Sequence, residues 1–261
     1  MAKHALCVGI NDYPGTNNDL SGCVNDANDW GAVLTKLGYS VTPLIDSKAT
    51  RAGRVAALTA LVQGAKEGDD LVFTYSGHGS WLPDENGDEA DGRDEMLCPH
   101  DIDSQQYLMD DDLDHIFKAK HPKARLLFIS DSCHSGSVTR MAPAIGDAPK
   151  IRARLLPPET FVKDPALLER VRNVAISTKG TRQKYPALLI SGCRDREVSY
   201  DASFGGRANG ALTRVAIDAH ASKPKTPREW HSLIRKRLPS VDYPQSPQLY
   251  GSRTAMAGSL F

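Results

Sequence analysis

Two short apolar runs constrain the fold of this chain more than any other feature. Residues 71–75 (LVFTY) and 126–129 (LLFI) are almost wholly apolar, and each leads into a polar segment that contains glycine. An apolar run of about four to eight residues suits a strand that is covered on both faces, because buried helices are usually longer. The sequence therefore predicts a sheet that is buried between layers of helices.

The rest of the chain alternates in the same way between apolar segments and segments with helical spacing. The sequence predicts strands at residues 4–10, 41–45, 70–75, 125–130, 186–191 and 248–250 and helices at residues 19–37, 49–65, 110–119, 211–221 and 227–238. This order indicates an α/β fold with a mostly parallel central sheet of about six strands and helices on both faces. We expect one domain over residues 1–261, made of a first part (1–136), a connection (137–185) and a second part (186–261).

The polar segments after the two apolar runs carry a histidine and a cysteine. His78 lies between two glycines after the first run, and Cys133 follows the second run directly. Catalytic groups of open α/β sheets gather at the carboxyl ends of strands, and neighbouring strands lie about 4.8 Å apart. An imidazole at that distance can take the proton of a thiol as it attacks, and the backbone N–H groups of Gly79 and Cys133 can form an oxyanion hole. Either residue alone also fits a buried structural role, and the pair together favours catalysis.

Composition excludes several other classes of protein. The chain has 32 basic and 32 acidic residues, which argues against nucleic acid as the main partner. Its five cysteines are widely spaced without a CxxC pair, so neither a disulfide framework nor a zinc site is expected. No apolar stretch is long enough to span a membrane, and the first residues do not form a signal peptide. We therefore predict a cytoplasmic protein without a membrane partner.

The paired motifs resemble those of the metacaspases, the caspase-like cysteine peptidases. The resemblance rests on residues 75–79 (YSGHG) and 131–136 (DSCHSG), and the histidine lies 55 residues before the cysteine. Residues 9–13 (GINDY), 20–27 (LSGCVNDA) and 91–95 (DGRDE) also match, so the likeness covers roughly residues 4–137. It implies a caspase-like three-layer fold, cysteine endopeptidase activity, no covalent cofactor and a monomer.

The resemblance also implies a specificity pocket and a metal. The matching positions Cys23, Asp26, Ser76 and Asp131 would line a pocket for arginine or lysine. Two desolvated carboxylates strongly prefer a cationic guest, although Asp26 could also be a surface helix residue and Asp131 a loop cap. Calcium is expected at Asp94, Asp110 and Asp111, because hard oxygen ligands suit Ca²⁺.

Two long connections carry opposite charge. Residues 81–109 are dense in carboxylates, and residues 137–185 lean basic. Long connections are often functional, although a solvated surface loop explains charge bias equally well. An enzyme that cuts after basic residues could cleave itself in the second connection, and we predict such self-processing.

Two other functions stay open at this point. The chain could be a silent caspase-like protein that binds basic peptides, although the intact His78 and Cys133 argue against it. It could also be a transpeptidase or amidase that uses the same Cys–His pair. These enzymes differ chiefly in how long water is kept from the thioester, which the sequence does not reveal.

Overall fold

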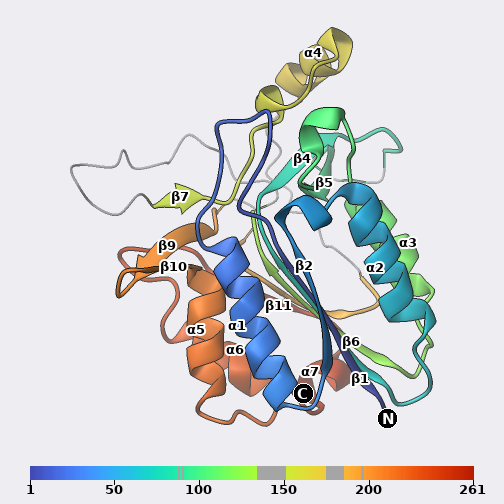
Figure 1. The fold of residues 1–261 in the computed structure, drawn as a ribbon, viewed down its shortest axis with the longest axis vertical. Coiled ribbons are helices and arrows are strands. Elements are labelled where there is room, and N and C mark those ends of the chain that lie inside the picture. Colours follow the sequence, from blue (N-terminus) through green and yellow to red (C-terminus); the bar gives the residue numbers. More distant parts are fainter. Residues whose placement is uncertain (88, 90, 134–150, 175–184, 195–196) are drawn as a thin grey trace.

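The computed structural model describes residues 1–87, 89, 91–133, 151–174, 185–194 and 197–261. A six-stranded sheet forms its centre, with strand order β11-β8-β6-β3-β1-β2 (Figure 1). Its strands are β1 (Lys3–Gly9), β2 (Ser40–Ile45), β3 (Asp70–Ser76), β6 (Arg125–Asp131), β8 (Leu188–Ser191) and β11 (Gln248–Tyr250). All neighbouring pairs are parallel except β11 with β8. The predicted α/β class and the mostly parallel sheet are confirmed.

Helices cover both faces of this sheet (Figure 1). One layer contains α1 (Cys23–Lys36), α5 (Ala211–His220) and α6 (Pro227–Arg235), and the other contains α2 (Arg51–Gln63) and α3 (Asp110–Lys118). Side chains of a strand alternate between the two faces, so Phe73 of β3 packs in one core and Val72 in the other. Trp30 and Trp230 fill the first layer, where their rings meet edge to face at 5.9 Å.

Two smaller sheets stand beyond the central one. The strands β4 (Gly79–Pro83) and β5 (Arg93–Leu97) pair antiparallel, and β7 (Arg152–Ala153), β9 (Tyr200–Phe204) and β10 (Arg207–Gly210) form a second sheet. The first is a correction, because residues 81–109 were expected to be a loop. The acidic residues conceal a hairpin whose buried apolar side chains include Trp81, Leu82, Met96 and Leu97.

The remaining differences are small or lie beyond the predicted elements. The first helix begins at Cys23 rather than at residue 19, because the carboxylate of Asp201 accepts the backbone N–H groups of Ser21 and Gly22. Within the connection, residues 151–174 contain β7 and the helix α4 (Pro165–Asn173), and a short helix α7 (Arg253–Ala257) follows β11. None of the helices in the described ranges has the length and apolar character that a bilayer crossing requires.

Candidate active site

The catalytic candidates leave the sheet side by side. β3 pairs with β6 in parallel, and the register places Ser76 opposite Asp131 at the ends of the two strands. His78 and Cys133 each follow two residues later. The predicted adjacency of these two strands is therefore confirmed.

His78 is buried and its backbone is tightly held. Its side chain contacts the carbonyl oxygen of Asn18 at 2.6 Å through Nε2, and its backbone N–H donates to the Tyr13 hydroxyl at 2.7 Å. Within the described residues Nδ1 has no partner in good hydrogen-bond geometry, although the backbone of Arg154 lies near the ring. Burial lowers the pKa of His78 to about 4, against the opposing effect of the Asn18 carbonyl. The imidazole is therefore neutral at physiological pH, as a general base must be.

Cys133 is fully buried in a small cluster with Leu155 and Cys193. Its Sγ accepts the backbone N–H of Ser199 at 2.6 Å. Contact with the Cys133 thiol and then burial raise the pKa of Cys193 well above its usual value. All five cysteines are free thiols, as the sequence predicted.

No hydrogen bond joins the thiol of Cys133 to His78 in the part of the chain that the structure describes. The backbone carbonyl of Arg154 instead occupies the space beside both residues. It accepts the N–H of Gly79 at 3.0 Å and the N–H of Cys133 at 3.2 Å. These are the two donors that the sequence predicted for an oxyanion hole, and they converge on one carbonyl oxygen.

Residue 79 must be glycine for this arrangement. A Cβ atom there would collide with the backbone carbonyl of Cys133. The missing side chain lets the two loops approach until their N–H groups reach the same oxygen.

The Arg154 side chain lies among the residues that were predicted to line an acidic pocket. Its guanidinium lies 2.7 Å from a carboxylate oxygen of Asp26, 3.0 Å from Asp201 and 3.3 Å from Asp131. It also donates to the backbone carbonyl of Asp131 at 3.1 Å. The arginine and all three carboxylates are buried, so the pairing replaces the hydration that each charge has lost.

The pKa values follow from this geometry. Burial acts to lower the pKa of Arg154, but the neighbouring Cys23 and the three carboxylates raise it well above its usual value. Burial raises the pKa of Asp26 to about 6, while Arg154 acts to lower it. Ser76 completes the wall, because its hydroxyl donates to Asp26 at 3.0 Å. The four residues predicted for the pocket thus lie around one guanidinium.

Asp201 belongs to this pocket and was not predicted. It lies at the start of β9, far along the chain from Asp26 and Asp131. A signal was present, because Gly205 and Gly206 both adopt positive φ and form the tight turn between β9 and β10. A hairpin predicted at these two glycines would have placed Asp201 on a strand, where alternate side chains share one face of the sheet.

The segment around Arg154 binds as an added strand. Arg152 and Ala153 pair antiparallel with β9, and the backbone N–H of Arg154 donates to the carbonyl of Ser199 at 2.9 Å. On the other side of Arg154, the N–H of Leu156 donates to the carbonyl of Gly79 at 2.9 Å. Backbone pairing with a sheet edge, combined with a pocket for one side chain, is a common way of binding peptides.

Comparison with known proteins identifies the family. The sequence model described as "Metacaspase, peptidase C14 domain" matches residues 3–142, which is more than half of the chain. The chain belongs to the metacaspases. Metacaspase-1 of Cryptococcus neoformans var. neoformans is 33% identical over 99% of this chain and 64% of its own length. Metacaspase-1 of Mycosarcoma maydis is 31% identical over 99% of this chain and 72% of its own. This metacaspase therefore spans about two thirds of the length of these relatives.

Two solved structures are similar to this chain. A crystal structure of a Geobacter sulfurreducens protein matches 99% of this metacaspase and 98% of its own chain, with a TM-score of 0.75 and 29% identity. The Drosophila initiator caspase Dronc matches 98% of this chain and 81% of its own, with a TM-score of 0.56 and 12% identity. At that identity the second likeness shows the shared caspase-like fold alone.

The predicted calcium ligands of this metacaspase lie where β5 meets α3. Asp94 is on β5, Asp110 and Asp111 begin α3, and a bridge between Met96 and Met109 joins the two elements. Burial raises the pKa of Asp110 to about 7, and Glu89, Asp111 and Asp94 add to that shift. Over the described positions, no three His, Cys, Asp or Glu side chains come close enough together to hold a metal ion.

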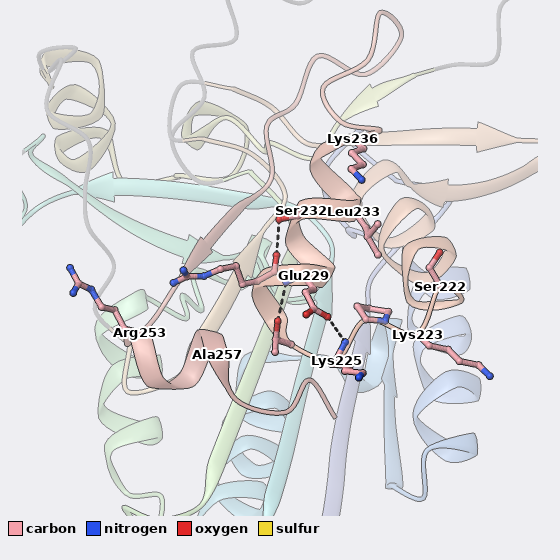
Figure 2. A pocket seen from close by; sticks show the side chains of 12 residues that line it. Ser222, Lys223, Lys225, Glu229, Ser232, Leu233, Lys236, Arg253 and Ala257 are labelled. Carbon is pink, nitrogen blue, oxygen red and sulfur yellow. Dashed lines mark hydrogen bonds between the residues drawn. The ribbon is translucent and has the colours of Figure 1, made fainter.

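A wide groove of about 990 Å³ lies at the opposite end of the molecule from β7 (Figure 1), and Figure 2 shows the side chains that line it. It is formed by α6, α7 and the turn before α6, near the amino end of β6, because Leu260 bonds both the backbone of Lys225 and the side chain of Arg125. Its lining contains neither cysteine nor histidine. The catalytic candidates are absent from it because they follow the opposite ends of the strands, where residues 152–156 fill the space.

Proposed function

We propose that this metacaspase is a cysteine endopeptidase that cleaves after arginine or lysine, with Cys133 as nucleophile and His78 as base. The observation that carries the proposal is the placement of Arg154. Its side chain lies among three carboxylates while its carbonyl accepts two backbone N–H groups beside Cys133. A substrate arginine held in this way would present its carbonyl carbon to the thiol.

The chemistry follows from these positions. The sulfur of Cys133 attacks the carbonyl carbon, and the thiol proton passes to His78, which is neutral and able to accept it. The N–H groups of Gly79 and Cys133 stabilise the negative oxygen that forms. His78 then protonates the leaving amine, and water hydrolyses the thioester and frees the new carboxyl end.

The pocket favours arginine over lysine. The Asp131 carboxylate contacts Nη1 of Arg154, while the Asp26 and Asp201 carboxylates contact Nη2. A planar guanidinium can direct separate N–H groups to several carboxylates, whereas an ammonium is a single point charge. We therefore expect faster turnover of arginine substrates, slower turnover of lysine substrates and none of aspartate substrates.

Self-processing at the Arg154–Leu155 bond is part of the proposal. In the uncut chain, residues 152–156 occupy the positions that a substrate needs. Cleavage of the Arg154–Leu155 bond would separate residues 152–154 from residues 155–156. The new chain end that carries Arg154 could then leave the pocket. Further basic residues of the connection, including Arg140, Lys150, Lys179, Arg182 and Lys184, lie outside the described residues.

A panel of fluorogenic peptides that differ only at the residue before the cleaved bond tests the proposal. Wild type should release the fluorophore from arginine and lysine peptides, and Cys133→Ala should release none. Intact mass after incubation should show cleavage after Arg154 in wild type and an uncut Cys133→Ala chain. Turnover of the aspartate peptide, or equal activity of the Cys133→Ala variant, would reject the proposal.

Two alternatives are separated by the same preparations. A silent binding protein would retain arginine peptides without cutting them, and the occupied pocket suits such binding as well. A transpeptidase would pass the thioester to an added amine rather than to water. Mass analysis of the products with and without a competing amine nucleophile distinguishes hydrolysis from transfer.

Calcium activation is a further proposal for this chain. It is supported by the like charges of Asp111 and Asp94, which add to the raised pKa of Asp110, and it requires the three carboxylates to move closer together than they lie in the described residues. Isothermal titration with calcium chloride should give heat of binding, and a chelator should lower peptidase activity. A cytoplasmic location and a monomeric state stay predictions, which fractionation and light scattering can test.

A further inference from the structure

The peptide that joins His78 to Gly79 is anchored at both ends. Its N–H, which belongs to Gly79, donates to the Arg154 carbonyl at 3.0 Å. Its carbonyl oxygen, which belongs to His78, accepts the hydroxyl of Tyr75 at 2.6 Å and the backbone N–H of Cys98 at 3.0 Å. The Tyr75 hydroxyl oxygen also lies 2.9 Å from the Cys98 carbonyl oxygen, and the shorter distance favours the His78 carbonyl as the acceptor of its single proton. Because a peptide unit is planar and trans, its N–H and C=O point in opposite directions. Anchoring the carbonyl therefore fixes the direction of the Gly79 N–H.

This peptide needs an external anchor because of its sequence. Position 79 is glycine since a Cβ would collide with the Cys133 carbonyl, and glycine is the residue with the least conformational preference. A peptide that precedes glycine can rotate with little steric penalty, which would turn its N–H away from the reacting carbonyl. Glycine at position 79 is thus required for the close approach to Cys133, but it leaves the direction of the Gly79 N–H without a local steric constraint.

Tyr75 is built to supply that constraint. Its side chain is 1% exposed, and the guanidinium of the buried Arg54 lies 5.4 Å from the centre of its ring. A Cβ at Gly77 would lie 2.6 Å from the Tyr75 hydroxyl, so the absence of a side chain at residue 77 lets the hydroxyl reach the loop. The nearby Tyr13 hydroxyl accepts the N–H of His78 in the preceding peptide and donates its own proton to the Tyr75 hydroxyl.

We propose that Tyr75 is a positioning residue, which holds the 78–79 peptide so that the Gly79 N–H points at the carbonyl oxygen of the bond to be cut. The proposal rests on the peptidase function proposed above and goes beyond it. Tyr75 touches neither substrate nor nucleophile, and acts through the peptide. Its hydrogen bond should matter most when negative charge develops on the substrate oxygen.

Tyr75→Phe tests the proposal because it keeps the ring and removes the hydroxyl. Loss of one complete oxyanion donor costs about 10²–10³ in kcat, so loss of its anchor, with Cys98 still in place, should cost about 10–50-fold. KM for an arginine peptide should stay within about twofold, since the ground-state carbonyl carries little charge. Rates are expressed per active site, titrated with an irreversible thiol reagent, so that unequal self-processing does not enter the comparison.

A second measurement separates positioning from general damage. A peptide aldehyde that ends in arginine adds the Cys133 thiol and places its oxygen in the oxyanion hole. Its affinity should fall by the same factor as kcat, whereas affinity for the corresponding peptide alcohol, which is neutral and cannot add the thiol, should not change. Tyr39→Phe is the matched control, because it removes a buried tyrosine hydroxyl that donates to Asp70 at the far end of β3. That variant should keep wild-type kcat.

Incorporation of 3-fluorotyrosine at position 75 restores the hydroxyl and should restore kcat and aldehyde affinity together. Wild-type kcat in Tyr75→Phe, a change in KM alone, or a loss of aldehyde affinity that does not track kcat would overturn the proposal. If Tyr75→Phe does not fold, an inactive 3-fluorotyrosine protein with a wild-type melting temperature would overturn it equally. If instead wild type itself cleaves no arginine peptide, the proposed function has failed and not the role of Tyr75.

Discussion

Two acidic clusters of this metacaspase differ in how the negative charge of their carboxylates is balanced. The specificity cluster (Asp26, Asp131 and Asp201) is drawn from α1, β6 and β9, is buried, and surrounds the guanidinium of Arg154. The outer cluster (Asp94, Asp110 and Asp111) comes from β5 and the adjoining start of α3, and mutual repulsion contributes to the raised pKa of Asp110. Converging carboxylates are thus stable in the first cluster because a cation lies among them.

Removing one charge from the specificity cluster should have the largest effect. Asp26→Asn leaves the shape of the pocket but deprives a bound guanidinium of one buried partner. Breaking a buried ion pair costs about 3–5 kcal/mol, so kcat/KM for an arginine peptide should fall by at least about 100-fold.

The matched control is Asp29→Asn, one turn further along α1. Asp29 pairs with Arg207 near the surface, where such a bridge contributes little, and kcat/KM should stay within about twofold. Equal losses in the two variants would remove the distinction between buried and exposed pairing on which the pocket argument rests.

Acid should weaken the specificity cluster in the same direction. The pKa of Asp26 is about 6 with a guanidinium in place, so its carboxylate takes up a proton below that pH and kcat for an arginine peptide should fall about tenfold from pH 7 to 5. His78, whose pKa is about 4, stays neutral over this range. A pH-rate profile of Asp26→Asn should therefore be nearly flat there.

The expected loss of activity is not a loss of folding through Asp26. The folded-state pKa of Asp26 is higher than its unfolded value, so the stability it contributes is full below about pH 4 and declines as pH rises through about 6. Melting temperatures across the same pH range check this sign. An unchanged acidic limb in Asp26→Asn would assign that limb to another group.

Replacing Arg154, the cation of the specificity cluster, should change peptidase activity by a smaller factor than Asp26→Asn does. Arg154→Gln removes the residue that the pocket binds, so cleavage after residue 154 should cease and the initial rate on a short arginine peptide should rise several-fold. Intact mass and initial-rate measurements check both outcomes. The variant also leaves three buried carboxylates without their guanidinium, so its melting temperature should fall.

Arg154→Lys serves as the companion variant. It keeps a positive charge but reaches fewer carboxylate oxygens, and we expect slower self-cleavage with a smaller loss of stability. Self-cleavage of Arg154→Gln at an unchanged rate would show that the processing site lies elsewhere in the chain.

Removing a charge from the outer cluster should raise the melting temperature, and this effect should be the smallest of those predicted. Asp110→Asn removes one of several like charges, and relief of about 1 kcal/mol in chelator should raise the melting temperature by about 2–4 °C. The same substitution should abolish any rise in melting temperature on adding calcium. Asp242 is exposed, and Asp242→Asn is the control, which should change neither the melting temperature in chelator nor its response to calcium. A lower melting temperature of Asp110→Asn in chelator would mean that Asp110 is compensated as the first cluster is.

The sequence predicted those parts of the site that local pattern controls. His78 and Cys133 were placed correctly at strand ends because a fully buried strand such as β3 has a distinct composition. The carboxylates of residues 81–109 conceal most of the hairpin of β4 and β5, because a high density of charge is typical of a surface loop. Charged side chains are compatible with a strand whose other positions are buried.

The contents of the pocket could not be predicted in the same way. Arg154 is one of many basic residues in its connection, and nothing local distinguishes it. Its selection depends on β9 supplying both the pairing edge and Asp201, which are brought near Asp26 only by the complete fold. The role of Tyr75 is hidden for the same reason, because a tyrosine at a strand end is equally typical of simple packing.

The presence of Arg154 and its three carboxylates in one chain has a consequence for how the chain folds. Three acids gathered in a dry pocket repel one another, and a chain that had to fold with that pocket vacant would need protons or a borrowed ion to do so. Here the counter-ion, Arg154, is part of the same polypeptide, so it does not have to be captured from solution. Departure of this segment should then be accompanied by proton uptake from the buffer, which a weakly buffered indicator solution can record.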